Sequence, residues 1–254
     1  MKILLTNDDG IHSKGLHCLA THLLEKHEVT IIAPMAENSG ISHSFTIFSP
    51  LFIRELSLPG GLKGHGVNGT PSDCVKIGVK KIMPARPDLV ISGFNRGENT
   101  GISAFYSGTV AGAREGVFFR IRSLSLSLMA FSDAHYGFAL SWLDGFLEKL
   151  ASNKIGFDGS RTFLNVNFPA CSPEQIEGTR LTRQGMTPFN DDYEERKSPS
   201  GQNYFWLFGD RPPEPDARAD ETAVEKGFVT VTPLSVDMTD YGFLEKYSSA
   251  PVFE

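Results

Sequence analysis

Two adjacent aspartates, Asp8 and Asp9, follow the first apolar segment of the chain in the run Thr6-Asn7-Asp8-Asp9-Gly10. Two carboxylates this close repel each other unless a positive charge lies between them. Mg²⁺ and Mn²⁺ prefer oxygen ligands of this kind. Asn, Asp and Gly are also the residues that commonly form tight turns. By itself the run therefore fits a divalent-metal site and a plain turn equally well.

The segments around the aspartates predict an open, mostly parallel α/β sheet with helices on both faces. Residues 2–6 form a continuous apolar run, which is typical of a buried parallel strand, and an amphipathic helix and a second strand follow. This βαβ beginning is Rossmann-like. The predicted strands are 2–6, 29–33, 88–92, 123–128 and 162–168, and the predicted helices are 14–26, 109–118, 135–151 and one that opens at Thr70.

The helix that opens at Thr70 has clear starting signals. Thr70 suits the N-cap, Pro71 the first turn, and Asp73 the positive end of the helix dipole. Gly78 lies on the same face as the apolar stripe that follows. We therefore expect this helix to approach its neighbour closely at Gly78.

Polar residues follow other strands of the predicted sheet. Ser39 comes after the second strand and Asn95 after the strand at 88–92. Ligands of open α/β sheets bind beyond the carboxyl ends of the strands, so these residues should share a crevice with Asp8 and Asp9. Carboxylates, a hydroxyl and an amide form an all-oxygen ligand set that suits Mg²⁺ or Mn²⁺. Each piece alone is also explained by a turn or by local hydrogen bonds.

The run Ser107-Gly108-Thr109 opens the predicted helix at 109–118. A helix N-terminus offers free N–H groups and a positive dipole end, which is a natural phosphate seat. Gly108 would allow close approach of an anion to the backbone. Ser107 is equally explained as a simple N-cap.

Composition restricts the kind of protein. The chain has 254 residues, a formal net charge of −6, and 40% hydrophobic and 21% charged residues. An acidic chain is a poor binder of nucleic-acid polymers, which require a basic face. The apolar start is broken by Asp8 before a signal peptide could form, and no run approaches a membrane span. Three widely separated cysteines predict reduced thiols and a cytoplasmic location. Cys18 and His22 have a helical spacing that zinc could use, but core packing explains them better.

The C-terminal part differs from the rest. We expect a core at 1–185, with a β excursion at about 43–66, and an extension at 186–254 that belongs to the same domain. Residues 204–208 read Tyr-Phe-Trp-Leu-Phe, and three prolines follow between 212 and 215. Such an apolar strand beside a stiff linker predicts an arm exchanged between subunits. A surface hairpin is the alternative.

The chain resembles the SurE family of survival-protein phosphatases, which are metal-dependent 5′(3′)-nucleotidases. The likeness runs from end to end of the sequence. It rests on residues 3–10, Ala33-Pro34 with Ser39-Gly40, residues 69–75, 92–99 and 106–116, and the tail segments 204–206 and 227–234.

The resemblance implies specific roles and an assembly. It implies one divalent metal ion per subunit, Mg²⁺ or Mn²⁺, a Rossmann-like core and a homodimer or homotetramer. Phe94, Asn38 and Ser198 depart from the usual family residues. By the resemblance Phe94 flanks the pocket and Asn38 removes a possible anion contact, which leaves substrate preference open. The implied metal ligands are Asp8, Asp9, Ser39 and Asn95; the implied catalytic residues are Asp8, Asp9, Asn95 and Ser107; and the implied phosphate contacts are Asn7, Asn99, Ser107, Gly108 and Thr109.

The expected reaction is hydrolysis of nucleoside 5′- and 3′-monophosphates, and the sequence leaves open whether short polyphosphate is also cleaved. The alternative is a metal- and phosphate-responsive switch protein without turnover. A receiver-type switch would need a separate phosphoacceptor aspartate, and Asn95 stands in that place. A dinucleotide enzyme would need Gly-x-Gly-x-x-Gly after the first strand, and a haloacid-dehalogenase-type phosphatase would need Asp-x-Asp; neither motif is present there.

Overall fold

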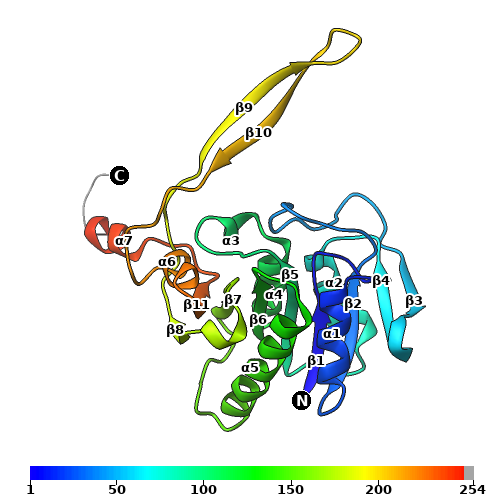
Figure 1. Ribbon diagram of the computed structural model, residues 1–254. Coiled ribbons are helices and arrows are strands. Elements are labelled where there is room, and N and C mark those ends of the chain that lie inside the picture. The colour runs from blue at the N-terminus through cyan, green and yellow to red at the C-terminus, as the bar shows by residue number, and fades with distance from the viewer. Residues whose placement is uncertain (249–254) are drawn as a thin grey trace.

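The computed structural model describes residues 1–248 and is built around one sheet of nine strands in the order β3-β4-β2-β1-β5-β6-β7-β11-β8. The central strands run parallel, while β3 and β11 run antiparallel to their inner neighbours β4 and β7. Helices cover both faces of the sheet (Figure 1), so the predicted α/β fold is confirmed. The strands of this sheet are β1 Lys2–Thr6, β2 Glu28–Pro34, β3 Ile53–Ser57, β4 Lys63–Val67, β5 Leu89–Arg96, β6 Arg122–Leu128, β7 Thr162–Phe168, β8 Gly178–Leu181 and β11 Phe228–Ser235.

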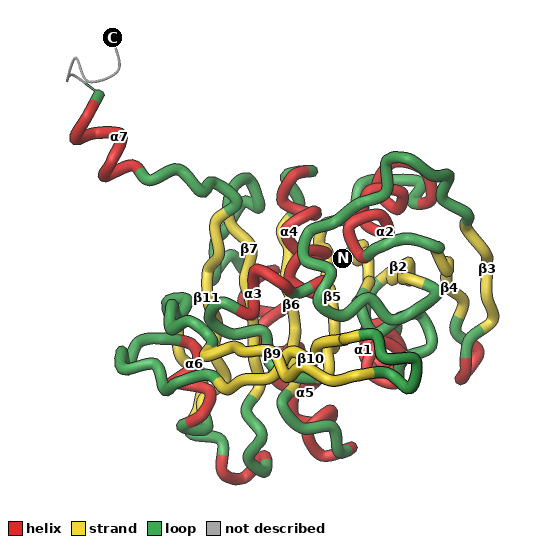
Figure 2. Tube along the Cα trace, turned by 90° about the horizontal axis from the view of Figure 1, so that it is seen from above, coloured by secondary structure: helices red, strands yellow, loops and turns green. Residues whose placement is uncertain are grey.

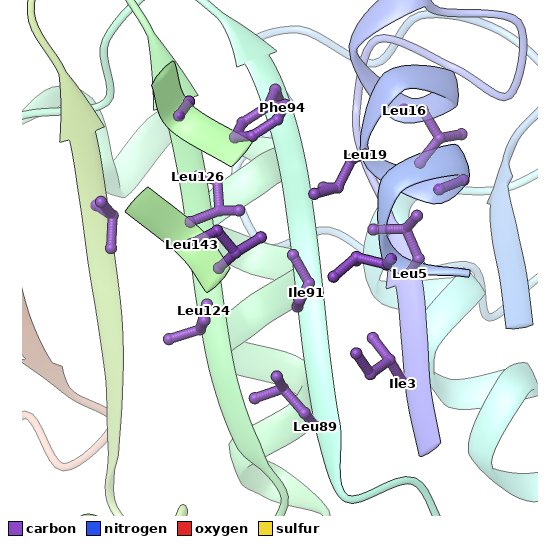
Figure 3. Packing of buried hydrophobic residues seen from close by; sticks show 14 of the residues in the cluster. Ile3, Leu5, Leu16, Leu19, Leu89, Ile91, Phe94, Leu124, Leu126 and Leu143 are labelled. Carbon is purple, nitrogen blue, oxygen red and sulfur yellow. The ribbon is translucent and has the colours of Figure 1, made fainter. Parts of the chain in front are cut away.

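One face of the sheet is covered by α1 (Lys14–Leu23) and α5 (Asp133–Ala151). Leu16 and Leu19 of α1 and Leu143 of α5 are fully buried against the sheet residues of the largest apolar cluster. Figure 3 shows these side chains with Ile91, Leu124 and other apolar residues of the central strands. This packing fixes the helix that follows the paired aspartates.

The other face is covered by α2 (Pro71–Ile77) and α4 (Gly108–Phe118). Thr70 and Asp73 form the reciprocal capping box that the sequence predicts. A Cβ on Gly78 would lie 2.7 Å from side-chain carbons of Leu4 and Ile32, so the predicted close approach is present. The regular helix nevertheless ends at Ile77 and continues as a turn of π-helix, η2 (Gly78–Ile82).

Shorter elements connect these layers. The excursion at 43–66 contains β3 and β4, but residues 43–52 form no strand. None of the helices within residues 1–248 is long and apolar enough to cross a membrane. The remaining short helices are η1 (Pro59–Gly61), α3 (Ser103–Tyr106), η3 (Pro173–Gln175), α6 (Asp220–Glu225) and α7 (Tyr241–Tyr247).

The segment from residue 186 onward both leaves and rejoins the core. β9 (Asn190–Lys197) and β10 (Asn203–Asp210) form an antiparallel hairpin that projects from the molecule (Figure 1). Every hairpin strand residue is exposed, including Phe205, Trp206 and Phe208. The chain then returns through α6 to β11, which pairs with β7 inside the main sheet. Figure 2 shows α7 extending away from the body.

The strand order reverses between β1 and β5. β1 pairs with β2 on one side, and with β5, which comes much later in the sequence, on the other. In open α/β sheets this switch point opens a crevice beyond the carboxyl ends of the strands. Asp8 and Asp9 follow β1, and Asn95 lies near the end of β5. The topology therefore brings the predicted residues to one edge of the sheet.

Candidate metal and phosphate site

Asp8 is fixed by the start of α4. The Thr109 backbone N–H donates to Asp8 Oδ2 at 2.9 Å, and the Thr109 hydroxyl donates to Asp8 Oδ1. Burial raises the pKa of Asp8, and these hydrogen bonds act in the opposite direction. In this structure both donors of Thr109 orient the Asp8 carboxylate, and its contact with phosphate remains a prediction.

Gly108 fits between Asp8 and the loop after β2. A Cβ at this position would lie 2.9 Å from Asp8 Cβ and 3.1 Å from the Asn38 carbonyl oxygen. The Asn38 N–H in turn donates to the Asp8 carbonyl oxygen at 2.8 Å. Three separate segments therefore meet at Asp8 with no space for a side chain at residue 108.

The Asp9 carboxylate is not fully hydrogen-bonded. Its Oδ2 atom is buried and has no hydrogen-bond partner among the described residues. Burial, followed by the negative charge of Asp8, raises the pKa of Asp9 to about 6. A buried carboxylate oxygen without a donor, beside a second carboxylate, is a site that a divalent cation would satisfy. The residues present therefore fit a metal ion of the Mg²⁺ or Mn²⁺ type.

Asn95 and Ser39 reach the same edge with different contacts. The pairing of β5 with β6 is irregular between Ser92 and Asn95, which turns the end of β5. Asn95 Nδ2 donates to the Gly97 carbonyl oxygen at 2.7 Å, so the amide is oriented by its own loop. Ser39 is exposed, and its hydroxyl donates to Glu37 Oε1 at 2.7 Å. Their roles as metal ligands remain predictions.

Asn7 is completely buried beneath the paired aspartates. Its Nδ2 donates to the Gly10 carbonyl oxygen at 3.1 Å and to Ser13 Oγ at 2.7 Å. Ser13 is also the N-cap of α1. Asn7 thus ties the Asp8-Asp9 turn to the next helix, and a contact with phosphate remains a prediction for it.

Asn99 lies in the loop after β5 and is held by a buried polar network. Its N–H donates to Asn167 Oδ1 at 2.7 Å, and its Nδ2 donates to Ser127 Oγ at 2.8 Å. Asn165 Nδ2 donates to the Asn99 carbonyl oxygen at 2.7 Å. Ser107 caps α4 by accepting the Val110 N–H at 3.1 Å. Asn99 and the N-terminus of α4 therefore place polar groups at this edge of the sheet, where they can orient an anion.

A cavity of about 510 Å³ opens beside Asp9, on the side of α1. The Arg96 guanidinium lies 5.2 Å from the ring centroid of Phe131, and Lys14 Nζ lies 5.5 Å from that of Tyr136. Phe94 is buried and its ring packs against that of Tyr136. Phe94 therefore lies behind the cavity wall and does not line the cavity itself. The cavity is lined by Asp9, His12, Ser13, Lys14, Gly15, Glu37, Arg96, Phe131 and Tyr136.

Several residues around the site were not predicted from the sequence. Glu37 is close enough for its charge to raise the pKa values of both Asp8 and Asp9. Phe131 lies just before α5 and Tyr136 lies near the start of that helix, where the sequence carries no motif. A signal for Glu37 existed, since it follows β2 just before Ser39. The aromatic residues carry no such signal.

The zinc alternative at Cys18 and His22 is not supported. His22 Nε2 lies 2.9 Å from Asp144 Oδ1, and Cys18 packs against the apolar core. Within the described residues, no group of three or more His, Cys, Asp or Glu side chains is placed to hold a metal ion. Core packing, which the sequence favours, is the better account of Cys18.

Fold and site together define a Rossmann-like α/β protein with paired carboxylates and a helix N-terminus at the switch point of its sheet. Residues 3–191 match the family model for survival protein SurE. The chain therefore belongs to the SurE family. It is 40% identical over 247 residues to the "5'-nucleotidase SurE" of Thermosipho melanesiensis, covering 97% of this chain and 96% of that one.

Other relatives agree with this assignment. The "5'-nucleotidase SurE" of Fervidobacterium nodosum is 40% identical over 250 residues, covering 97% of this chain and 95% of the relative. Among solved structures, the SurE protein from Aquifex aeolicus superimposes with a TM-score of 0.81 at 32% identity, covering 98% of each chain. The resemblance seen in the sequence is thereby confirmed over nearly its whole length.

Proposed function

We propose that this protein is a divalent-metal-dependent phosphatase that hydrolyses nucleoside 5′- and 3′-monophosphates to nucleoside and phosphate. The observation that carries the proposal is the adjacent pair Asp8 and Asp9 at the sheet switch point: Asp8 is buried and bonded to the N-terminus of α4, and Asp9 has a buried Oδ2 atom without a hydrogen-bond partner among the described residues. The names of the SurE relatives support the same reaction class. A switch protein without turnover finds no comparable support.

Different residues of the site have different proposed roles in this reaction. Asp8 and Asp9, with Ser39 and Asn95, would hold one Mg²⁺ or Mn²⁺ ion per subunit. A bound ion of this kind supplies positive charge to the phosphoryl oxygens and lowers the pKa of a water molecule. Asn99 and Ser107 would position the phosphoryl group, with the dipole of α4 favouring its negative charge. Thr109 keeps the Asp8 carboxylate in one orientation.

The cavity beside Asp9 is the proposed place of the nucleoside. It adjoins a proposed metal ligand, and its volume is that of a small-molecule pocket. Phe131 offers a ring face on which a base can stack, with the Arg96 guanidinium close by. Cleavage of short polyphosphate is also part of the proposal. A substrate without a nucleobase can still place its phosphoryl group at the proposed metal site.

An exchanged arm is the proposed basis of assembly. The β9–β10 hairpin exposes aromatic side chains on both of its faces, which a single subunit leaves uncovered. A second copy of the chain would cover them in a homodimer or homotetramer. The cytoplasmic location remains a prediction, based on the three separated cysteines.

The proposal is tested by phosphate release from a panel of 5′- and 3′-nucleoside monophosphates and tripolyphosphate, with Mn²⁺, with Mg²⁺ and with EDTA. We expect release with metal and none in EDTA. Folded protein that releases no phosphate under any of these conditions would favour the switch alternative.

Replacing Phe131 with leucine tests the nucleoside cavity. We expect the KM for adenosine 5′-monophosphate to rise roughly tenfold, because a stacking contact with the base is lost. The kcat/KM for ribose 5-phosphate, which has no base, should stay unchanged. The control is Phe118→Leu. Phe118 is the last residue of α4, far from the helix N-terminus that meets Asp8, and its ring stacks on His43. An equal loss for both substrates would contradict this placement of the base.

A further inference from the structure

The loop of residues 97–101, which carries Asn99, is held by residues that lie on either side of the β9–β10 hairpin in the sequence. Asp220 of α6 accepts the Gly101 N–H at 3.2 Å, and Gln184 Nε2 donates to the Gly101 carbonyl oxygen at 2.8 Å. Both residues lie more than 80 positions further along the chain. The geometry of this loop therefore depends on residues that flank the hairpin.

Arg211 is the central contact between the loop and the hairpin. It is the first residue after β10, and its side chain is only 15% exposed. Its Nη2 lies 3.3 Å from Glu98 Oε1, its Nη1 lies 3.0 Å from Glu221 Oε1, and Nη1 donates to Thr100 Oγ1 at 3.2 Å. Arg211 thus contacts the residues on either side of Asn99.

The charges explain why this contact matters. The Glu221 side chain is only 3% exposed, so its carboxylate is buried, and Arg211 lies between it and Glu98. Without the guanidinium, the Glu98 and Glu221 carboxylates would have no cation between them and would repel, and Asp220, Glu214 and Glu225 already add negative charge around Glu221. A buried charge left without its partner is costly. The repulsion would push Glu98, and Asn99 with it, away from α6.

We propose that Arg211 is a positioning residue that couples the foot of the β9–β10 hairpin to the phosphate-holding loop 97–101. The hairpin then does more than present an apolar surface, because its position is transmitted to Asn99. A subunit contact that moves the hairpin foot would change phosphate affinity at the site. The phosphate part of this inference rests on the proposed function, whereas the coupling between hairpin and loop does not.

Three variants distinguish the proposed coupling from a general loss of stability. Arg211→Gln leaves Glu98 and Glu221 facing each other. Glu98→Gln removes the loop-side charge but keeps the Arg211–Glu221 pair, so the C-terminal segment retains its buried ion pair. The double variant Arg211→Gln/Glu98→Gln removes the repulsion. The matched control is Arg218→Gln, which breaks an ion pair with Asp216 in the C-terminal segment and leaves Gln184 and the loop contacts in place.

The primary measurement is amide hydrogen exchange of the peptide covering residues 97–105 in metal-free protein. We expect faster exchange in Arg211→Gln, near wild-type exchange in Glu98→Gln, and a return toward wild type in the double variant. Arg218→Gln should leave this peptide unchanged. Exchange that rises only within the C-terminal segment, with no change at 97–105, would overturn the coupling.

The second measurement is the inhibition constant for inorganic phosphate in the nucleotidase assay. We expect it to rise about tenfold in Arg211→Gln, a typical size for coupling through one contact network, with a smaller change in kcat. The double variant should recover most of this loss. A tenfold rise that the double variant does not relieve would overturn the repulsion argument. A wild-type protein without any phosphatase activity would overturn the proposed function alone, because the exchange measurement does not depend on turnover.

Discussion

Replacing Asp8 with asparagine is expected to lower kcat for nucleotide hydrolysis at least about a hundredfold while the fold stays intact. The carboxylate supplies charge that a divalent cation requires, and electrostatic stabilisation of the reacting phosphoryl group is lost with it. An asparagine fits the same place, since its Oδ1 can accept the Thr109 N–H and its Nδ2 can donate to the Thr109 hydroxyl. Initial rates at saturating metal measure the effect.

Stability distinguishes this result from simple misfolding. Burial raises the pKa of Asp8 in the folded protein, so above that pKa the ionised carboxylate costs the metal-free fold some stability. The asparagine variant has no such charge, and its Tm in EDTA at pH 7 should equal or exceed that of the wild type. Mn²⁺ should raise the Tm of the wild type only. The control is Asp88→Asn, a strand-end carboxylate that accepts the Lys2 N–H and lies at the opposite end of the sheet.

Replacing Gly108 with alanine is expected to reduce kcat about a hundredfold for a steric reason. The added Cβ would come within 2.9 Å of Asp8 Cβ, so either the Asp8 turn or α4 must move. A displacement of this order at a catalytic constellation costs about two orders of magnitude in rate. Helix propensity alone favours alanine over glycine, so intrinsic helix stability does not predict this loss. Steady-state kinetics with the best nucleotide of the panel provide the measurement.

A second helical glycine is the control for that substitution. Gly145 lies within α5, and a Cβ there would meet no atom within 4 Å. Gly145→Ala should therefore keep full activity and raise the free energy of unfolding by about 0.5–1 kcal/mol. If Gly108→Ala retained full activity as well, the packing of α4 against Asp8 would have no bearing on catalysis.

The parallel core of the fold was predictable because local signals agreed there. Residues 162–168 form β7 with the predicted bounds, and the continuous apolar run at 2–6 forms β1. The buried strand predicted at 88–92 corresponds to the first part of β5. The helix at Thr70 was recognised by its cap, but its end was not, because the turn of π-helix after Ile77 preserves the apolar spacing. The place of β11 inside the main sheet depends on pairing with β7, which no local pattern reveals.

The site was predictable only in part, for a related reason. Asp8 and Asp9 follow β1 and Asn95 lies near the end of the adjacent β5, so topology alone brings them together. Two features could not be foreseen. Thr109 gives both of its donors to Asp8, and Arg211 reaches the loop from more than 100 positions away. Such contacts depend on side-chain direction and on long-range return of the chain, which spacing in the sequence does not encode.

The most direct test of the account is a calorimetric titration of metal-free protein with Mn²⁺, for the wild type and for Asp9→Asn. The account predicts one ion bound per chain in the wild type and at least tenfold weaker binding in the variant, because a buried carboxylate oxygen without a partner is removed. Equal Mn²⁺ affinity in the two proteins, or no binding by folded wild type, would contradict the claim that the paired aspartates form a metal site.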